Sequence, residues 1–435
     1  MTEPQPIAPL RIALAGLGTV GAGLVRLIEA NGELIARRAG RPVEIVAVSA
    51  RDRSKDRGID LSPYDWEDDM TALAERPDVD VVVELVGGAD GPALTTARRA
   101  LGAGKALVTA NKAMIAHHGL ELAQLAEANG AALRFEAAVA GGIPVIKGLR
   151  EGAAANRIER IFGILNGTCN YILSTMEQTG RDFGDVLAEA QALGYAEADP
   201  TFDVEGIDAA HKLSILAAIA FGTKVDFAAV DVEGIGRVRA ADIAQAGVLG
   251  YRIRLIGTAE VDDRGDLFQR VQPCLVPLGH PLAAVDGATN AVVAEGNYSG
   301  RLLFQGAGAG DGPTASAVAA DIVDIARGDI GAPFSVPAAS LEALAPADTG
   351  HRTNRAYLRF VVADRPGVLA EITAAMRDGG VSIESMIQHG RPEEGGEVLV
   401  AMVTHEGPEA NVARALALLE GSESLAEAPL VMRLI

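Results

Sequence analysis

Carboxylates and one lysine crowd into a short stretch of the chain that could do acid–base chemistry. Residues 194–212 read GYAEADPTFDVEGIDAAHK, in which five acids precede Lys212. Asp208 and Lys212 stand four residues apart, so they share one face of a helix that continues into the apolar run LSILAAIAF. A half-buried amine beside a carboxylate can hold a substrate oxygen and pass its proton. The alternative is an ion pair on a helix surface, which contributes roughly 0.2–0.5 kcal/mol.

A glycine-rich loop near the N-terminus indicates that a nucleotide takes part. The segment AGLGTVGAG has GxGxxG spacing, directly after an apolar strand pattern and directly before a helical one. The first glycine permits a tight turn, the second lets the backbone approach a pyrophosphate, and the third allows the helix to pack closely on the strand. The alternative is a tight turn without a ligand. We expect dinucleotide contacts from Gly16, Gly18, Thr19, Val20 and Gly21.

The end of the second strand favours NADP over NAD as this dinucleotide. Enzymes that use NAD place an acid there to hold the ribose hydroxyls. Here the strand VEIVAVSA ends without a carboxylate, and Arg51 and Lys55 follow, so a guanidinium could attract a 2′-phosphate. The alternative is that both are loop charges, since Asp52 lies beside Arg51. A hydride acceptor of either kind implies a carbonyl–alcohol pair as the substrate.

Other chemistries have weaker support in the sequence. It contains no Ser-Tyr-x-x-x-Lys pattern and no zinc-ligand spacing of Cys and His. His117 and His118 are adjacent, so they do not share one helix face, and we expect surface or capping roles for them. Cys169 would suit a phosphorylating semialdehyde dehydrogenase, but that chemistry needs a histidine base, and no histidine is near it in sequence. We therefore expect a structural role for Cys169.

The composition of the whole chain limits the class of protein. A length of 435 residues predicts two or three domains. The net charge of −20 argues against a nucleic-acid partner, because phosphate binding needs a basic face. No apolar run reaches the roughly 18 residues of a membrane span, and the N-terminus lacks the basic region of a signal peptide. Two cysteines suit a reducing cytoplasm, where we expect the protein to act.

The order of strand and helix patterns predicts the fold class. Apolar strands alternate with helical patterns at the start of the chain, which is typical of a Rossmann-type doubly wound parallel sheet in an α/β protein. The middle of the chain predicts an α+β domain, and the end a ferredoxin-like β-α-β-β-α-β domain. The predicted divisions are the nucleotide-binding domain at 1–138, the α+β domain at 139–305, a helix returning to the nucleotide domain at 306–330, a linker at 331–353 and the C-terminal domain at 354–435.

With these features together, the sequence resembles homoserine dehydrogenases over nearly its whole length. The segments that carry the resemblance are GLGTVG at 16–21, TANKA at 109–113, EAAVAGGIP at 136–144, NGTCNYIL at 166–173, LGYAEADPTFDVEGIDAAHK at 193–212 and GAGAGDGPTASAV at 306–318. The C-terminal domain resembles an ACT module, with DRPGVLAEI at 364–372 as its signature. Two departures are Ala307, where relatives often have proline, and Cys169, where they often have threonine.

The resemblance implies an activity and a set of site residues. The activity is the NAD(P)-dependent interconversion of L-homoserine and L-aspartate 4-semialdehyde, in threonine, methionine and isoleucine biosynthesis. Lys212 matches the catalytic lysine that exchanges a proton with the substrate oxygen, Asp208 the aspartate beside it, and Lys112 a lysine between cofactor and substrate. The remaining matches are Gly194, Glu197 and Asp203 for substrate binding, Lys105 and Gly312 for cofactor binding, and Glu136, Val139, Gly141 and Ile143, largely through carbonyl oxygens, for a sodium ion.

The ACT resemblance implies regulation and assembly. We expect feedback inhibition by L-threonine, bound near Asp364, Gly367, Val368 and Leu369 and the facing strand around 382–385. The alternative is that the module only assembles dimers. The family's middle domain, with catalytic and dimerisation roles, implies at least a homodimer, and ACT pairing could make a homotetramer. A non-catalytic amino-acid sensor is the rival from another class, and the intact pair of Asp208 and Lys212 argues against it.

Overall fold

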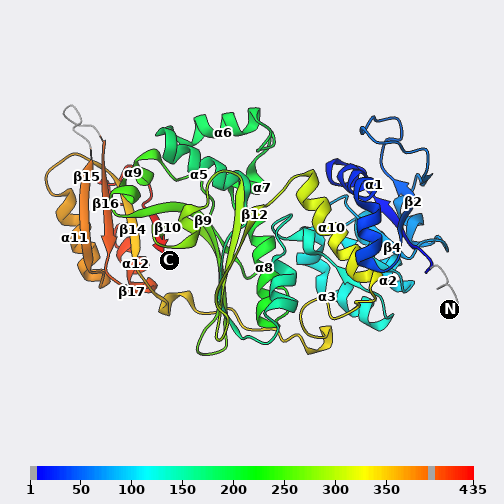
Figure 1. Cartoon of the computed structure of the whole chain (residues 1–435). Helices are drawn as coiled ribbons and strands as arrows, with labels where there is room; N and C mark the ends of the chain where they lie inside the picture. The colour runs from blue at the N-terminus through cyan, green and yellow to red at the C-terminus, as the bar shows by residue number, and fades with distance from the viewer. Residues whose placement is uncertain (1–6, 390–396) are drawn as a thin grey trace. The chain divides into compact units, whose positions relative to one another are not determined.

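The computed structural model describes residues 7–389 and 397–435, and the chain forms two compact units (Figure 1). Each unit is built from segments that are distant in the sequence. Residues of the predicted 139–305 domain are divided between the two units. The first unit comprises Met1–Leu165, Asp208–Val230 and Thr289–Leu344, and the second comprises Asn166–Ile207, Asp231–Ala288 and Ala345–Ile435.

The first unit holds the predicted nucleotide-binding fold and several later segments. Its strands are β1 (Leu10–Ala15), β2 (Val43–Ser49), β3 (Asp65–Trp66), β4 (Val81–Glu84), β5 (Ala106–Thr109), β6 (Leu133–Arg134), β7 (Ile158–Ile164), β11 (Thr289–Gly296) and β12 (Gly300–Ala307). Its helices are α1 (Thr19–Ala39), α2 (Pro92–Gly102), α3 (Lys112–Ala128), α4 (Val145–Lys147), α8 (Ile207–Phe221, which begins one residue before the unit) and α10 (Asp311–Ala326), with short turns η1 (Met70–Ala74), η2 (Glu136–Ala138), η3 (Gly148–Gly152) and η5 (Ala338–Ser340).

Six strands of this unit form an all-parallel sheet in the order β3-β2-β1-β4-β5-β6. Ile12 of β1 lies opposite Ile45 on one side and Val81 on the other. The central strands are apolar and buried along their length, because helices cover both faces of a parallel sheet. The strand order reverses between β1 and β4, and a crevice at such a switch point is where ligands bind in folds of this kind.

Two later segments pack onto this unit. Helix α10 lies against α1 so closely that a Cβ on Gly23 would stand 2.9 Å from the carbonyl oxygen of Asp311. The first part of the segment predicted as a linker belongs to this unit and packs against it. Phe334 is fully buried there and packs on Phe135, with ring centroids 5.2 Å apart. A glycine at position 119 is required at this contact, since a Cβ would lie 2.9 Å from the Phe334 ring.

Helix α8 is the element that carries the acid–lysine pair. Most of its residues are apolar, and every residue from Asp208 to Ile219 is buried, the charged pair included. A helix with this pattern belongs to a core rather than a surface. The antiparallel strands β7, β11 and β12 belong to the same unit, with Val292 of β11 between Gly163 and Phe304.

The second unit holds the remaining helices and strands. Its elements are α5 (Gly167–Thr179), α6 (Phe183–Ala192), α7 (Thr201–Val204), β8 (Asp231–Val232), α9 (Ala240–Val248), β9 (Tyr251–Val261), β10 (Leu267–Pro277), η4 (Pro281–Ala284), η6 (Thr349–His351), β13 (Thr353–Asn354), β14 (Ala356–Ala363), α11 (Val368–Gly379), β15 (Ile383–His389), β16 (Glu397–Thr404), β17 (Gly407–Pro408), α12 (Glu409–Ala417) and β18 (Leu430–Leu434).

The C-terminal part of this unit is the predicted β-α-β-β-α-β domain. Its strands lie in the order β18-β14-β16-β15, and α11 and α12 contribute to a core around Phe360, Ile372 and Met402. This order, together with the parallel sheet of the first unit, confirms the predicted fold class. The domain is not isolated, since β18 pairs in parallel with β10, where Cys274 lies opposite Arg433.

The helices were compared with the requirements for a membrane span. Within residues 7–389 and 397–435, no helix combines the length and the apolar character that crossing a bilayer requires.

Candidate active site

The carboxylate of Asp208 is the centre of a buried charge cluster in the first unit. Its Oδ2 accepts a hydrogen bond of 2.7 Å from Nζ of Lys212, and its Oδ1 lies 2.9 Å from Nζ of Lys112. Asp208 is only 3% exposed. The structure therefore brings together the three residues predicted to be catalytic, although almost a hundred positions separate Lys112 from Asp208 in the sequence.

The Lys212 ammonium is held by a second acceptor. The carbonyl oxygen of Leu165, at the residue after β7, accepts a 2.7 Å hydrogen bond from Nζ. Asn290 of β11 donates to the same carbonyl at 3.0 Å. A Cβ on Gly308 would lie 2.1 Å from Asn290, so the GAGAG loop must have glycine at this position. The lysine is thus held by Asp208 on its own helix and by the Leu165 carbonyl, and Asn290 in turn holds that carbonyl.

Local sequence explains how Lys112 reaches the carboxylate. Asn111 is the N-cap of α3, and its Oδ1 accepts from the amide of Met114 at 3.0 Å. Its Nδ2 donates to the Gly88 carbonyl at 2.7 Å, which fixes the start of the helix. Lys112 is the first residue of α3 and remains one-third exposed along its side chain. Lys112 therefore contacts the buried carboxylate while part of its side chain remains accessible to solvent.

The electrostatics of the cluster keep Asp208 ionised. Burial alone would raise the pKa of its carboxyl group, but the ammonium groups of Lys212 and Lys112 more than offset this and hold the pKa well below its usual range. A carboxylate between two ammonium groups can position both of them. The arrangement suits a step in which a proton moves to or from an oxygen placed beside a lysine.

A histidine pair lies beside the cluster, and sequence reasoning missed it. The Nε2 atoms of His211 and His117 lie 3.3 Å apart, and the His211 ring stacks on Phe227 with centroids 4.2 Å apart. Burial and the neighbouring His117 lower the pKa of His211 to about 4. His117 itself is exposed, as predicted, but it is not a simple surface residue. No local spacing could have indicated a contact between residues this distant in sequence.

The glycine loop between β1 and α1 has the geometry expected of a phosphate cradle. Gly16 has φ of 106°, and a Cβ on Gly21 would lie 2.2 Å from the Gly16 oxygen, so both positions require glycine. A Cβ added at Gly18 would meet no atom within 4 Å, and no side chain caps α1, which begins with Thr19 and Val20. An uncapped helix start beside an unobstructed glycine fits a pyrophosphate group.

The basic loop after β2 presents an arginine that the sequence did not single out. Arg51 and Lys55 are both exposed, and Asp52 accepts from the Ser54 amide at 2.8 Å rather than from Arg51. Arg57 donates through Nε to the carbonyl oxygen of Leu17, inside the glycine loop, at 3.0 Å. A guanidinium is therefore fixed next to the predicted nucleotide site, six residues beyond the predicted one.

Lys105 and Gly312 occupy very different places. Lys105 precedes β5, at the amino ends of the parallel strands, and its Nζ donates to the Arg76 carbonyl. The glycine loop follows the carboxyl end of β1, so the position of Lys105 does not support the predicted cofactor contact. Gly312 is the second residue of α10, which packs on α1 beside the glycine loop.

The predicted cation loop is strained and buried. Ala140 and Gly141 have successive positive φ values of 56° and 55°. A non-glycine residue in this conformation is a common mark of a functional loop. No hydrogen bond from the described part of the chain reaches the carbonyl oxygens of Val139 and Gly141, whereas that of Ile143 accepts from the Val145 amide at 2.8 Å.

The side chain of Glu136 is committed to the protein. Its two oxygens accept from the amides of Ile146 and Lys147 at 2.9 and 2.8 Å. Burial and nearby Asp321 raise the pKa of this carboxyl group to about 7. Only its carbonyl could serve a cation, and that oxygen already accepts from the Val139 amide at 3.3 Å. Across 7–389 and 397–435, no group of three or more acidic, histidine or cysteine side chains has the geometry of a metal site.

The predicted substrate-binding residues Gly194, Glu197 and Asp203 belong to the second unit. Asp203 accepts a 2.7 Å hydrogen bond at Oδ1 from Asn166, the N-cap residue of α5. Glu197 and Gly194 are exposed. Asp199 has a structural use, since its carboxylate accepts from the Thr201 amide at 3.1 Å.

Cys169 is placed as a structural residue. It is fully buried on α5, its amide donates to Asn166, and its Sγ donates to the Asp203 carbonyl at 3.2 Å. Burial raises the pKa of the other thiol, Cys274, to about 12. Neither cysteine forms a disulfide, and both are buried, which does not suit a nucleophile.

The predicted regulatory residues surround the start of α11. Gly367 has φ of 98° and precedes the helix, whose first turn has no side-chain cap. Asp364 is exposed, Val368 is buried in the domain core, and Leu369 is partly buried.

Comparisons with protein families match most of the chain. A family model described as homoserine dehydrogenase matches residues 144–323. One described as the NAD binding domain of homoserine dehydrogenase matches residues 16–136, and an ACT domain model matches residues 356–420.

Several individual proteins are similar to the chain over nearly its whole length. The chain is 46% identical to homoserine dehydrogenase of Pseudomonas aeruginosa, covering 96% of both chains, and 44% identical to that of Mycobacterium tuberculosis H37Rv, covering 99% of both. The crystal structure of a homoserine dehydrogenase from Thiobacillus denitrificans aligns with a TM-score of 0.92 at 43% identity, covering 99% of both. A hyperthermophilic archaeal homoserine dehydrogenase in complex with NADPH aligns with a TM-score of 0.62 at 28% identity, covering 73% of this chain and 97% of that one.

Proposed function

Because the chain belongs to the homoserine dehydrogenase family, we propose that Asp208, Lys112 and Lys212 are the catalytic centre for interconverting L-homoserine and L-aspartate 4-semialdehyde. The chain is an NAD(P)-dependent oxidoreductase with a C-terminal ACT domain. The observation that carries the proposal is one buried carboxylate that binds two lysine ammonium groups.

Lys212 is the group that exchanges the proton. In the direction of oxidation, a nicotinamide held by the glycine loop would supply the hydride acceptor for the carbon that bears the hydroxyl group. In this direction Lys212 acts as the neutral amine and receives the hydroxyl proton to become the ammonium, so the carbon–oxygen single bond becomes a carbonyl and charge balances. In the other direction its ammonium protonates the aldehyde oxygen as the hydride arrives. Asp208 and the Leu165 carbonyl fix the nitrogen before the substrate binds, which lowers the entropic cost of reaching the reactive geometry.

Lys112 and the acids of the second unit have binding roles. Lys112 stabilises the developing charge on the substrate oxygen and orients Asp208. Asp203, fixed by Asn166, and Glu197 recognise the substrate ammonium, with Gly194 allowing the turn before them. The family resemblance supports these roles. Because Asp203 has a binding role, Asp203→Asn should raise KM for homoserine more than it lowers kcat.

The preferred cofactor is NADP. The glycine loop and the uncapped start of α1 would hold the pyrophosphate, with Gly312 of α10 close by. Arg51 and Lys55, together with Arg57, supply positive charge after β2, and the strand itself ends without the carboxylate that would favour NAD. The archaeal relative bound to NADPH is consistent with this preference. Arg57→Ala and Arg51→Ala should each lower kcat/KM for NADP more than for NAD.

A monovalent cation, sodium in this proposal, is bound by the loop after η2. The carbonyl oxygens of Val139 and Gly141 are its ligands, because hard cations of low charge prefer oxygen. Glu136 and Ile143 contribute less, since their carbonyl oxygens already accept amide hydrogens. Replacing sodium in the assay with a large organic cation should reduce activity reversibly.

Feedback control and assembly complete the proposal. L-Threonine, a product of the pathway, would bind beside Asp364 and Gly367 at the start of α11 and inhibit the enzyme. A homodimer or homotetramer in the cytoplasm is the working form, consistent with two cysteines that form no disulfide. A point variant tests regulation better than truncation, because β18 pairs with β10 and truncation would expose that edge. Threonine inhibition should weaken in Asp364→Asn and persist in Asp378→Asn.

The reaction is tested by initial rates with purified protein. Reduction of NADP and of NAD is followed with L-homoserine as the only substrate. Turnover that depends on homoserine and is faster with NADP supports both the reaction and the cofactor preference. Folded protein that turns over neither homoserine nor aspartate semialdehyde with either cofactor would refute the proposal.

A further inference from the structure

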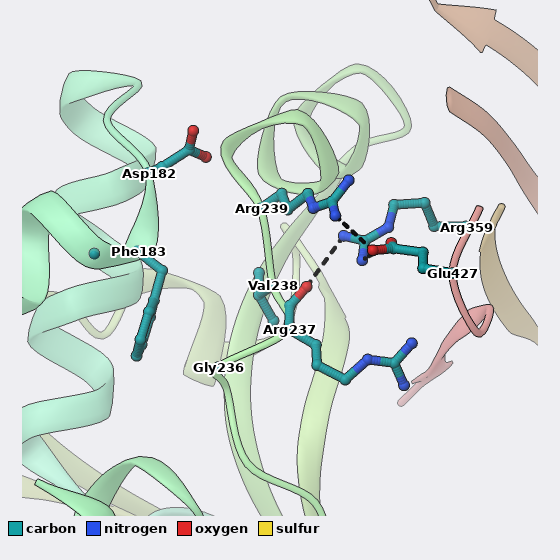
Figure 2. Close-up of a pocket in the computed structure, with 9 residues that line it drawn as sticks. Asp182, Phe183, Gly236, Arg237, Val238, Arg239, Arg359 and Glu427 are labelled. Carbon is teal, nitrogen blue, oxygen red and sulfur yellow. Dashed lines mark hydrogen bonds and ion pairs between the residues drawn. The ribbon is translucent and has the colours of Figure 1, made fainter. Parts of the chain in front are cut away.

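A cavity of about 380 Å³ lies within the second unit, where the ACT domain meets the segments that precede it (Figure 2). This volume is within the range of small-ligand pockets, about 300–1,000 Å³. Figure 2 shows Asp182 and Phe183, at the start of α6, on one side, and the arginines and Glu427 on the other. The cavity is lined by Asp182, Phe183, Gly184, Gly236, Arg237, Val238, Arg239, Arg359 and Glu427.

Two arginines of the lining are incompletely paired: Arg237 forms no close ion pair with the described residues, and Arg359 has one donor without an acceptor. Arg237 donates only to the carbonyl oxygens of Ala428 and Pro429, at 2.5 and 3.0 Å, and forms no ion pair with the described residues. The Nε atom of Arg359 is buried and has no acceptor in the described part of the chain, although that side chain is only 2% exposed. Buried donors without partners are uncommon in folded proteins and call for an explanation.

The start of α6 is the third donor. Asp182 occupies the N-cap position of this ten-residue helix, but its side chain makes no capping hydrogen bond. Its Oδ1 instead accepts from the amide of Ala240 at 3.0 Å. The first amides of α6, at Phe183 and Gly184, therefore have no side-chain cap where they line the cavity, and such a helix start attracts an anion.

The charge of the lining limits the anion to a single negative charge. Glu427 pairs with Arg239 at 2.6 Å and with Arg359 at 3.1 Å, and Asp242 pairs with Arg359 from outside the cavity. Among the three arginines of the lining, Arg237 is the one with no carboxylate at ion-pair distance among the described residues, and the Glu233 carboxylate interacts with it only from farther away. A dianion such as phosphate would meet the repulsion of Asp182 and Glu427. The single negative charge of a carboxylate would be balanced by the positive donors of the lining.

The rest of the lining has room for a short carbon skeleton. Phe183 and Val238 form apolar walls, and Gly184 and Gly236 leave space between them. A Cβ at Gly236 would have no neighbour closer than 4.0 Å. We propose that this cavity binds a small monocarboxylate with a compact apolar group, in a site separate from the dehydrogenase centre and from the start of α11.

Binding is measured on the full-length protein by saturation-transfer NMR and calorimetry, without turnover. The probes are isovalerate, L-valine, which adds an α-ammonium group to the same skeleton, and inorganic phosphate. Isovalerate or L-valine should bind. Comparing their two affinities shows whether the site prefers a simple carboxylic acid or an amino acid. Arg237→Gln should weaken binding by about tenfold or more, since it removes a charged donor. Gly236→Val, which fills the cavity without changing charge, should have the same effect.

Arg264→Gln, in the exposed turn after β9, is the matched control and should leave the affinity unchanged. Binding of phosphate alone would contradict the monocarboxylate site. Absence of binding by either carboxylate to folded protein would overturn it as well. Binding that neither Arg237→Gln nor Gly236→Val weakens would place the ligand elsewhere and also overturn the proposal.

Discussion

Nζ of Lys212 lies 2.7 Å from Oδ2 of Asp208, one turn away on α8, and the two side chains are only 10% and 4% exposed. The same spacing on a helix surface would contribute little. Inside the first unit, removal of Asp208 leaves two lysine ammonium groups without their buried carboxylate, which is costly, whereas removal of Lys212 leaves Asp208 paired with Lys112. The pair therefore matters both for the position of the lysine and for the stability of the buried helix.

Asp208→Asn should damage activity and stability together. The amide keeps the shape of the side chain but removes the charge that binds Lys112 and Lys212. We expect the free energy of unfolding to fall by about 3 kcal/mol in urea titrations, and kcat to fall by roughly 100-fold or more. Asp263→Asn makes the same change in the exposed turn after β9 and should alter neither quantity. Wild-type activity in Asp208→Asn would rule out its positioning role.

Gly308→Ala should disturb Lys212 from a distance. The added methyl group would lie 2.1 Å from Asn290, which donates to the same Leu165 carbonyl that holds the lysine. Overpacking of this kind costs about 1–3 kcal/mol, and we expect a lower melting temperature and a lower kcat. Gly32→Ala on α1 is the control. An added Cβ there would meet no other atom within 4 Å, so this substitution should stabilise the protein slightly. If Gly308→Ala retained full kcat, the link through Asn290 would be unimportant.

Cys169→Ser should retain activity. The hydroxyl group can still donate to the Asp203 carbonyl, and the buried thiol has no catalytic task in the proposed reaction. We expect kcat/KM for homoserine within about threefold of the wild type, with a stability loss of about 1 kcal/mol from burying a more polar group. Complete loss of activity in folded Cys169→Ser protein would revive a thiol mechanism.

The stability of the protein should decrease on mild acidification because of His211. Burial, together with His117, lowers its pKa to about 4 in the folded state, against about 6.5 when unfolded. The unfolded state therefore binds more protons as the pH falls from 6.5 to 4, and stability is lost across that window. After allowance for solvent screening, we expect a contribution of about 1–2 kcal/mol.

His211→Gln tests this contribution through the pH slope rather than the absolute stability. Urea unfolding at several pH values between 6.5 and 4 should give a shallower decline for the variant than for the wild type. His405→Gln, at an exposed position, should keep the wild-type slope. Identical slopes for wild type and His211→Gln would show that the imidazole titrates normally.

Local patterns were sufficient to predict the fold class. Continuous apolar strands such as Val81–Glu84 indicate a parallel sheet, because both faces are covered. The apolar run after Lys212 predicted a buried helix, and α8 is buried along its length. The division into units was not predictable in this way, since it depends on contacts between distant segments, such as α10 with α1.

The site could be predicted only in part. The four-residue spacing of Asp208 and Lys212 fixes their contact on a helix, whereas Lys112 came from the family resemblance alone. Arg57 and the His117–His211 contact left no signal in the sequence, because tertiary packing rather than periodicity brings them to the site. The prediction for Lys105 rests on its place just before a site segment in the sequence, whereas the structure places its ammonium on the Arg76 carbonyl, at the amino ends of the strands.

The most direct test of the central claim is the rate of NADP reduction by L-homoserine for Lys212→Met. Methionine keeps an unbranched apolar side chain but cannot exchange a proton. The control is Lys224→Met, an exposed lysine soon after the same helix. We expect kcat to fall by about 100-fold or more in Lys212→Met, with the fold retained by circular dichroism and little change in Lys224→Met. Undiminished kcat in folded Lys212→Met protein would contradict the assignment of this lysine as the proton-exchanging group.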